Sequence, residues 1–380
     1  MESIGAQAAH VRRRLAPERN HRTLELYALL IVALALPLDP DAELLRFAVD
    51  ELERNLAQDF RPDGVHREAS THYHMIALRS FVGALANCRR HGIELSAAYE
   101  ERLSRACDFA LHCRRPDGTI PALSDADTGD YTELLVLAGE LLDRDDLRGN
   151  TALATANVGF PDGGYYVQRA GDAFLIFDCG PLGDGGHGHY DLLSVEAWAG
   201  GRPLLVDPGR FTYSEHPPNL RRWFRGTAAH NTICVDGLDQ TPYTRTRPDG
   251  PVAEGRFLGR TSAPGVDLLE GEARSPAYDA VHHRRVAFVR GSHWVIEDRL
   301  HAETEHDYDL RLHLAPGDAV IRDGAVHAPG LTLVIQGADD VRLESGWIAP
   351  RYGERIAAPV VSAVRRGRGA SFTTLVVPQR

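Results

Sequence analysis

The stretch that decides the fold and the candidate site runs from Gly185 to Gly237. It opens with GGHGHYDLLSVEAWAGGRPLLVDPGRFTY at 185–213 and closes with RRWFRGTAAHNTICVDG at 221–237. The short apolar and β-branched runs at 203–206 and 231–235 predict strands. Side chains that ligate metals stand at the ends of these runs. The stretch therefore predicts a β structure with polar chemistry at its strand ends.

Four residues of this stretch have side chains that can bind a metal ion. His187 and His189 are two residues apart, so both would point to one face if the segment is extended. Asp207 ends the first apolar run, and His230 opens the second. Two imidazoles and one carboxylate can bind zinc and leave a fourth position for water. Spacing alone leaves a packing role open, because the candidates are spread over about 40 positions.

The same stretch, from HGHYDLLSVEAWAGG to VDPGRFTY and on to FRGTAAHNTICVDGLDQ, resembles the signature of the heparinase II/III-like polysaccharide lyases, which also include alginate lyases. The resemblance implies that the second histidine of HGH, the aspartate of VDPG and the histidine of AHNT hold a metal, usually zinc. These positions are His189, Asp207 and His230. It also implies that His187, the first histidine of HGH, faces the substrate.

Composition limits the class of protein. The chain has 380 residues, of which 43% are hydrophobic and 25% are charged, and this is typical of a globular protein with two domains. The net charge of −11 gives no basic footprint for nucleic acid, and an anionic sugar would need a locally basic site. The five cysteines form no CxxC pair, so we expect reduced, buried residues.

The N-terminal segment determines the expected location. Residues 1–21 contain no apolar core of a secretory signal, and the apolar run 26–36 is too short to span a bilayer. We therefore expect no membrane span and a cytoplasmic location, or a periplasmic or secreted one if the N-terminus is incomplete. The oligomeric state is left open.

The spacing of apolar residues changes along the chain and predicts an α+β multidomain fold. Apolar residues recur at helical spacing in the first half, at 24–36, 41–60, 70–90, 99–113 and 131–142. After about residue 155 the period becomes two, most clearly from Tyr308 to Leu314. We place a helical domain at 1–150 and a β domain at 151–380. The resemblance implies an incomplete (α/α) toroid, shortened here, followed by a large antiparallel β-sandwich.

The helical half supplies further candidates for catalysis. Asn20 and His21 precede an apolar helix; local chemistry favours an N-cap asparagine, whereas the resemblance matches them to an asparagine–histidine pair that contacts a uronate carboxylate and C5. Tyr73 matches the family's catalytic tyrosine in the segment from Asp63 to His74, although a tyrosine at a helix start is commonly a packing residue. Glu68 is assigned to substrate binding, where it would orient its neighbours.

These residues suit β-elimination from a 4-O-linked uronate. The reaction needs a neutralised carboxylate, a base for the C5 proton and an acid for the O4 leaving group. Asn20 and His187 would neutralise the carboxylate, and His21 and Tyr73 would share the base and acid roles. Two further substrate contacts are expected, from Arg225 and Tyr213, although Arg225 could equally form a structural ion pair.

Two other functions compete with the lyase. A glycoside hydrolase would use paired acids, for which LSDADTGD offers Asp125, Asp127 and Asp130, although this segment reads more simply as a turn and helix cap. A non-catalytic or biosynthesis-associated carbohydrate-binding protein would fit the shortened helical half. The expected partner of the lyase is a uronate-containing oligo- or polysaccharide, whereas the non-catalytic protein would suit an oligosaccharide or a sugar-bearing metabolite.

Overall fold

The computed structural model describes residues 2–36, 42–149 and 157–379. They form two compact units, one comprising Met1–Glu68, Tyr73–His112 and Tyr131–Leu153, the other Ala69–His72, Cys113–Asp130 and Ala154–Arg380. Two short segments from the helical half of the sequence thus belong to the β unit. The expected boundary between residues 150 and 151 lies outside the described residues.

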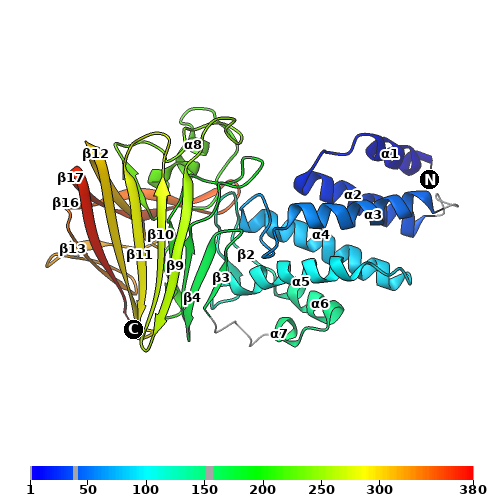
Figure 1. The fold of residues 1–380 in the computed structure, drawn as a ribbon, viewed down its shortest axis with the longest axis horizontal. Helices are drawn as coiled ribbons and strands as arrows, with labels where there is room; N and C mark the ends of the chain where they lie inside the picture. The colour runs from blue at the N-terminus through cyan, green and yellow to red at the C-terminus, as the bar shows by residue number, and fades with distance from the viewer. Residues whose placement is uncertain (1, 37–41, 150–156, 380) are drawn as a thin grey trace. The chain divides into compact units, whose positions relative to one another are not determined.

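The first unit is built mainly from α-helices (Figure 1). The helices of this half of the chain are α1 Glu2–Arg13, α2 Arg19–Ala35, α3 Glu43–Asp59, α4 Thr71–Arg90, α5 Ala97–His112, α6 Thr132–Leu142 and α7 Asp145–Arg148. In α3 the buried side chains Ala48, Leu52 and Leu56 recur every four residues, as the sequence predicts, and form the apolar face of the helix.

Helix α2 begins earlier than its apolar pattern suggests. It starts at Arg19 with Glu18 as N-cap, so Asn20 and His21 lie in its first turn rather than ahead of it. The N-cap interpretation of Asn20 is therefore wrong. The apolar side chains Leu26 and Leu29 are buried, while the first turn carries polar groups.

The β unit contains two large sheets whose neighbouring strands pair antiparallel. The ten-stranded sheet has the order β13-β14-β15-β17-β12-β11-β10-β9, with β16 paired to β17 and β8 to β12. Its strands are β8 Ile233–Val235, β9 Glu254–Ala263, β10 Val266–Arg274, β11 Val281–Val289, β12 His293–His313, β13 Val320–Arg322, β14 Ala325–Ala328, β15 Leu331–Gln336, β16 Asp340–Arg351 and β17 Glu354–Pro378.

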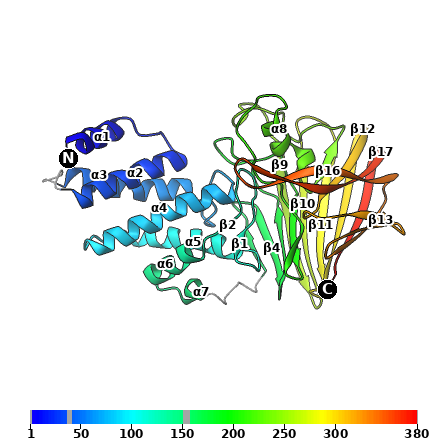
Figure 2. The same cartoon turned by 180° about the vertical axis from the view of Figure 1, so that it is seen from behind.

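The second sheet has five strands in chain order, β3 to β7. They are β3 Val158–Phe160, β4 Tyr165–Ala170, β5 Ala173–Asp178, β6 Val195–Ala199 and β7 Arg202–Leu205. A small pair, β1 Thr119–Ile120 and β2 Gly129–Asp130, flanks the loop 121–128, and the short helices α8 Leu220–Arg225 and η1 Thr227–Ala229 lie between β7 and β8. Figure 2 shows the β16–β17 hairpin from behind.

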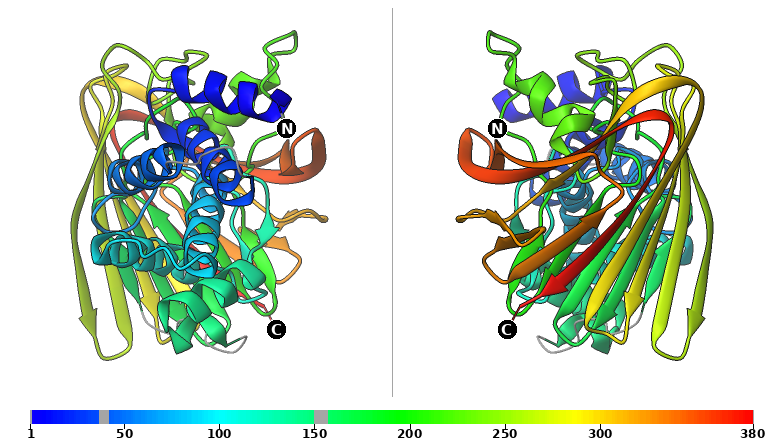
Figure 3. Two further views of the ribbon diagram at one scale, coloured as in Figure 1. Left: turned by 90° about the vertical axis from the view of Figure 1, so that its right-hand side faces the viewer. Right: turned by 90° about the vertical axis from the view of Figure 1, so that its left-hand side faces the viewer.

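The two sheets share one apolar core, as in a β-sandwich. Phe177 and Leu204 of the smaller sheet belong to the same buried cluster as Trp294 and Phe372 of the larger one. In β12 the predicted alternation is confirmed from Tyr308 to Leu312, because Tyr308, Leu310 and Leu312 are buried, but it ends at His313, which is buried as well. The long strands β12 and β17 curve along their length (Figure 3), with a register shift in their pairing between His301 and His306.

The predicted fold class is confirmed: a helical N-terminal region is followed by a large antiparallel β-sandwich. The five cysteines are free and buried, as expected from their spacing. Among the described residues, no helix has the length and apolar character needed to cross a membrane.

Candidate active site and metal-binding group

The candidate site in the β unit is carried by three loops. The loop between β5 and β6 carries His187, His189 and Asp191, Asp207 follows β7, and His230 follows η1. All three loops leave regular elements of one unit, so the sandwich fixes their bases. Residues separated by more than 40 positions are brought together in this way.

Gly188 permits the close turn within the HGH motif. A Cβ at this position would lie 1.9 Å from the carbonyl oxygen of Leu182, so a side chain would force the two backbone segments apart. The motif is tied down further by the backbone N–H of Tyr190, which donates to the carbonyl of Arg225 at 3.0 Å. The two flanking histidines are therefore held by the backbone before any side chain contributes.

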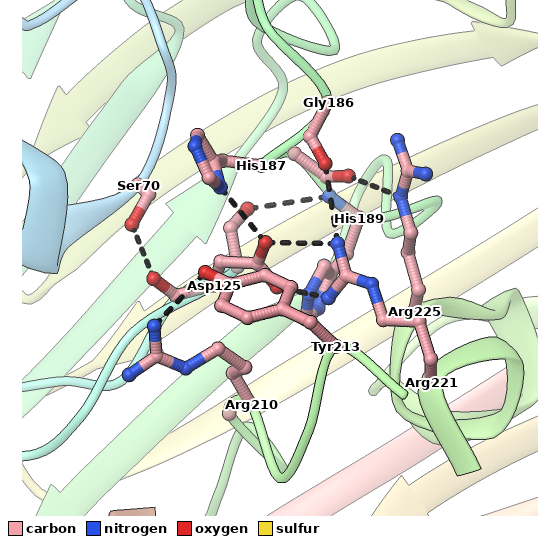
Figure 4. A network of polar contacts seen from close by, with 12 residues as sticks. Ser70, Asp125, Gly186, His187, His189, Arg210, Tyr213, Arg221 and Arg225 are labelled. Carbon is pink, nitrogen blue, oxygen red and sulfur yellow. Dashed lines mark hydrogen bonds and ion pairs between the residues drawn. The ribbon is translucent and has the colours of Figure 1, made fainter. Parts of the chain in front are cut away.

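Asp125 orients both histidines of the HGH motif (Figure 4). Its buried carboxylate accepts hydrogen bonds from Nδ1 of His187 at 3.0 Å and Nε2 of His189 at 2.9 Å. Arg221 donates to both of its oxygens. Burial opposes ionisation, but the two histidine hydrogen bonds and the charge of Arg221 hold the pKa of Asp125 well below its usual range. An ionised carboxylate only accepts, so each histidine nitrogen facing it carries a proton.

This proton placement gives the two histidines different exposed chemistry. When His187 is neutral with its proton on Nδ1, its Nε2 carries the lone pair, and 18% of the side chain is exposed. His189 is fully buried, and its Nδ1 has no hydrogen-bond partner within the described parts of the chain. Asp125 thus holds His187 with part of its ring exposed, and it holds His189 with the free Nδ1 available to a ligand inside the protein.

His189, Asp191 and His230 form a buried group that could bind a metal ion. One ligand atom from each lies within 4.8 Å of the others. The predicted ligand Asp207 lies beside this group, where its Oδ2 accepts a hydrogen bond from Nδ1 of His230 at 2.9 Å. The structure thus brings together His189 and His230, two of the three predicted metal ligands. The carboxylate of the three-residue group comes from Asp191, whereas the predicted ligand Asp207 holds the imidazole of His230.

The group has buried ring nitrogens without hydrogen-bond partners among the described residues, and such atoms suit a metal ion. Nε2 of His230, like Nδ1 of His189, is buried and makes no hydrogen bond in the ranges that the structure describes. A buried polar atom without a partner is costly, and a cation would satisfy it. The other nitrogen of His189 is bonded to the carboxylate of Asp125, as is usual for metal-bound histidines. Nδ1 of His230 is bonded to Asp207 at 2.9 Å and lies 3.9 Å from Oδ2 of Asp191.

The charges around the group also favour a cation. Burial lowers the pKa of His189 to about 4, so this imidazole is neutral at pH 7. Burial raises the pKa of Asp191 to about 6, against the nearby charge of His230. For His230 the effect of burial is outweighed by Asp207 and Asp191, which raise its pKa to about 9. Without a metal, the protonated imidazole of His230 therefore supplies the positive charge that the carboxylates need.

Arg225 is buried among backbone carbonyls beneath the HGH loop. Its side chain is fully buried, Nε donates to the carbonyl of Gly188 at 2.9 Å, and Nη1 donates to the carbonyls of Thr244 at 2.6 Å and Thr246 at 3.1 Å. Its Nη2 is buried and has no hydrogen-bond partner among the described residues, and the alternative ion pair with a carboxylate is not formed there either. Arg225 therefore fastens the HGH loop to the loop that follows β8, and its role as a substrate contact stays a prediction.

Tyr213 lies beside the outward-facing histidine. Its ring is 6.1 Å from that of His187, with an interplanar angle of 70°. Its hydroxyl accepts a hydrogen bond from Nη1 of Arg210 at 2.9 Å, and the guanidinium carbon of Arg221 lies 5.0 Å from its ring centroid. The structure thus brings the predicted substrate contact Tyr213 next to His187.

The remaining candidates belong to the helical unit. Asn20 is buried, and its Nδ2 donates to Oε2 of Glu68 at 2.7 Å. Glu68 is 1% exposed, which supports the orienting part of its prediction and leaves no surface for a sugar. His21 is exposed, and Tyr73 is half-buried in the first turn of α4. The catalytic roles of Asn20, His21 and Tyr73 stay predictions.

Sequence reasoning missed three residues of the site as the structure has it. Asp191 stands two residues after His189, so the same spacing argument that paired the histidines applies to it. The sequence marks Asp125 only as a candidate hydrolytic acid, and no local pattern connects it to His187, 62 positions later. Arg221 appears in the sequence as one of several arginines near Trp223, with nothing to mark it as the partner of Asp125.

Comparison with known proteins gives consistent matches along the chain. The model of the Heparinase II/III N-terminus matches residues 1–139, and that of the Heparinase II/III-like, C-terminal region matches residues 154–376. A heparin-sulfate lyase of Bacteroides stercoris is 24% identical over 336 residues, covering 82% of this chain and 48% of the relative. One of Pedobacter heparinus is 22% identical over 417 residues, covering 100% of this chain and 60% of the relative.

Solved structures show the same fold. A crystal structure of heparinase III has a TM-score of 0.87 at 18% identity, covering 99% of this chain and 64% of that one. Heparan sulfate lyase HepC from Pedobacter heparinus has a TM-score of 0.80 at 20% identity, covering 99% of this chain and 62% of that one. The chain thus spans between about half and two thirds of the length of these proteins.

Proposed function

Because the chain belongs to the heparinase II/III-like family, we propose that it is a polysaccharide lyase that cleaves a 4-O-linked uronate by β-elimination. The substrate is a uronate-containing oligo- or polysaccharide, and the product carries an unsaturated uronate. The relatives named as heparin-sulfate lyases support this class of substrate.

The observation that carries the proposal is the Asp125 carboxylate shared by the two histidines of the HGH motif. Elimination requires a group that meets the uronate carboxylate while negative charge develops on it. His187 is held by Asp125 with part of its ring exposed, whereas its neighbour His189 is turned into the protein. One exposed and one buried histidine suit a site that needs one reactive imidazole in a fixed orientation.

The other roles follow from side-chain chemistry. Asn20 donates to the substrate carboxylate together with His187, and Glu68 orients Asn20 through its hydrogen bond. His21 and Tyr73 remove the C5 proton and protonate O4, with Tyr73 as the donor to the leaving oxygen. A phenol suits this step because it transfers a proton without introducing a competing carboxylate.

We assign zinc to the buried group in the β unit, held by His189 and His230 with a carboxylate from Asp207 or Asp191. A bound zinc ion would supply a fixed positive charge that holds the three loops together. The HGH loop would then keep His187 in place without the ion touching the sugar. Two imidazoles with one carboxylate are a common zinc donor set, which supports zinc over calcium or magnesium.

Paired-acid hydrolysis is not favoured by the same geometry. Asp125 is held ionised by His187, His189 and Arg221, so it lacks the raised pKa of a general acid. Asp127 is bound to Nη2 of Arg210 at 2.6 Å. The third candidate of the hydrolase hypothesis, Asp130, lies in β2. None of these observations supplies the protonated carboxylic acid that glycoside hydrolysis requires.

The test is the appearance of an unsaturated product, measured by ultraviolet absorbance on oligomers of heparan sulfate, hyaluronan, alginate and glucuronan. We expect Tyr73→Phe to lose at least about a hundredfold in kcat, as for removal of a general acid. Tyr27→Phe, which removes a phenol from α2, is the control and should retain activity. Full activity of Tyr73→Phe would remove the assigned role, and binding without any product across the panel would favour the non-catalytic alternative.

A further inference from the structure

An exposed tyrosine is held firmly at the turn between β16 and β17. Tyr352 is 52% exposed, yet its backbone N–H donates to Oδ1 of Asp127 at 3.1 Å. The next N–H, of Gly353, donates to the carbonyl of Phe211 at 2.8 Å. A large aromatic side chain on a turn that is anchored on both sides presents a preformed surface, so a ligand would pay little ordering entropy to use it.

Arg210 fixes this tyrosine against a second one. Its guanidinium carbon lies 5.1 Å from the ring centroid of Tyr352 and 5.2 Å from that of Tyr213. Its donors bind the hydroxyl of Tyr213 at 2.9 Å and Oδ1 of Asp127 at 2.6 Å. The two rings are 5.8 Å apart with an angle of 32° between them. We call Tyr213, Tyr352 and Arg210 the tyrosine platform.

The tyrosine platform is continuous with the candidate active site. The ring of Tyr213 lies 6.1 Å from that of His187, so a molecule bound at His187 and extending over Tyr213 would next meet Tyr352. Figure 4 shows Tyr213 between Arg210 and Arg221, beside His187. A sugar residue spans a distance comparable to these separations, so neighbouring residues of one oligosaccharide can use neighbouring rings.

The charge around the turn suits an anionic sugar. Arg351 is exposed and lies opposite the exposed Glu354 in the hairpin register, although it forms no ion pair with any residue that the structure describes. Arg355 is also exposed, and its guanidinium carbon lies 4.2 Å from the ring centroid of Trp347 and 5.2 Å from that of Phe211. In a chain of net charge −11, basic side chains beside an aromatic surface give the local attraction that a polyanion needs.

We propose that the tyrosine platform is a sugar subsite, in which Tyr352 stacks on the pyranose ring of the residue adjacent to the uronate at His187. The apolar C–H face of a pyranose suits a tyrosine ring, and the neighbouring arginines suit carboxylate or sulfate groups on the same chain. The identity of the neighbouring uronate rests on the proposed lyase function, whereas the binding of an anionic oligosaccharide at Tyr352 does not.

The experiment measures binding and turnover separately on the full chain. Calorimetry with a heparan sulfate tetrasaccharide and with free glucuronate is performed in the Tyr73→Phe background, to avoid consumption of the ligand. We expect Tyr352→Ala to weaken tetrasaccharide binding about tenfold and to leave glucuronate binding unchanged, as for loss of a central aromatic contact. Tyr352→Phe retains the ring and should change tetrasaccharide affinity less than twofold by the same reasoning.

The control is Ile356→Ala, which removes a 46% exposed apolar side chain from the same hairpin and should bind as the parent does. Equal tetrasaccharide affinity in Tyr352→Ala and its parent overturns the subsite even if the protein is an active lyase. Weakened binding in a protein that makes no unsaturated product supports the subsite and removes the lyase proposal. A change in oligomeric state on sedimentation, with unchanged sugar affinity, would assign the surface to self-association and overturn it.

Discussion

Two clusters in the β unit each combine histidines with aspartates, and they differ in the hydrogen bonding of the ring nitrogens. His306 in β12 lies between Asp236, at 2.6 Å from Nδ1, and Asp279, at 2.5 Å from Nε2. We call these three residues the clamp. In the buried group of His189, Asp191 and His230, the two histidines each bind a carboxylate through one nitrogen and leave the other without a hydrogen-bond partner in the described chain.

The difference separates a structural cluster from one that fits a ligand. With both nitrogens donating, His306 is an imidazolium that ties two loops to β12, and nothing further is needed to satisfy it. His189 and His230 retain buried ring nitrogens without a hydrogen-bond partner in the described chain, a cost that folding alone does not offset. The number of unpartnered ring nitrogens, rather than the number of nearby carboxylates, is therefore the informative signal.

The largest expected effect comes from Asp125. Asp125→Asn would leave Arg221 buried without its anion and would replace one of the two oxygens that accept from the HGH histidines with a donor NH2 group. We expect a loss of about 3–5 kcal/mol in the free energy of unfolding, measured by urea denaturation. The matched change in the clamp, Asp236→Asn, should cost at most about 1 kcal/mol, because that carboxylate is near the surface. Similar losses in the two variants would remove the distinction between the clusters.

Metal loss should come next. His230→Ala is expected to reduce bound zinc from roughly one ion per chain to near zero, whereas His306→Ala should retain the ion, with metal content measured after dialysis. If zinc is present at about a thousand times its Kd, its removal by a chelator should cost the parent about 4 kcal/mol of unfolding free energy. Unchanged zinc content in His230→Ala would contradict the assignment of the group.

Arg225 tests the support beneath the HGH loop. Arg225→Lys keeps the charge but cannot reach the carbonyls of Gly188, Thr244 and Thr246 together, so we expect a loss of about 1–3 kcal/mol in stability. Glucuronate affinity per folded molecule should remain the same, because the side chain is fully buried. Stability equal to the parent combined with lost uronate binding would support the role of Arg225 as a substrate contact.

The smallest effect concerns the pH dependence of the clamp. Hydrogen bonds from His306 to Asp236 and Asp279 raise its pKa, so its contribution is complete below the unfolded value of about 6.5 and declines as the pH rises through the folded value. The pKa values of Asp236 and Asp279 are lowered, so the clamp also weakens in acid, below about pH 4.

The measurement compares the Tm of the parent with that of His306→Gln from pH 5 to pH 9. The difference between the two proteins should be greatest near pH 5–6 and should shrink as the solution becomes alkaline. A difference that stays constant across this range, or that grows toward pH 9, would show that His306 is not held as an imidazolium.

Periodicity was sufficient for the elements but not for all their ends. The four-residue steps of α3 and the two-residue alternation from Tyr308 to Leu312 follow from burial on one face, which a linear pattern records directly. The start of α2 at Arg19 escaped this reasoning, because its first turn is polar and Asn20 is buried through a hydrogen bond to Glu68 rather than through apolar contact.

The sequence by itself determined the family, the order of helices and sheets, and the histidines of the candidate site, because these depend on local spacing and on a contiguous motif. Only the tertiary structure decided that Asp125 orients both HGH histidines, that Arg225 supports a loop, and that Asp191 joins His189 and His230. Each of these facts depends on which buried donors and acceptors meet across distant segments. Hydrogen bonding in a protein interior is settled by the three-dimensional partners available, and a linear pattern does not encode those partners.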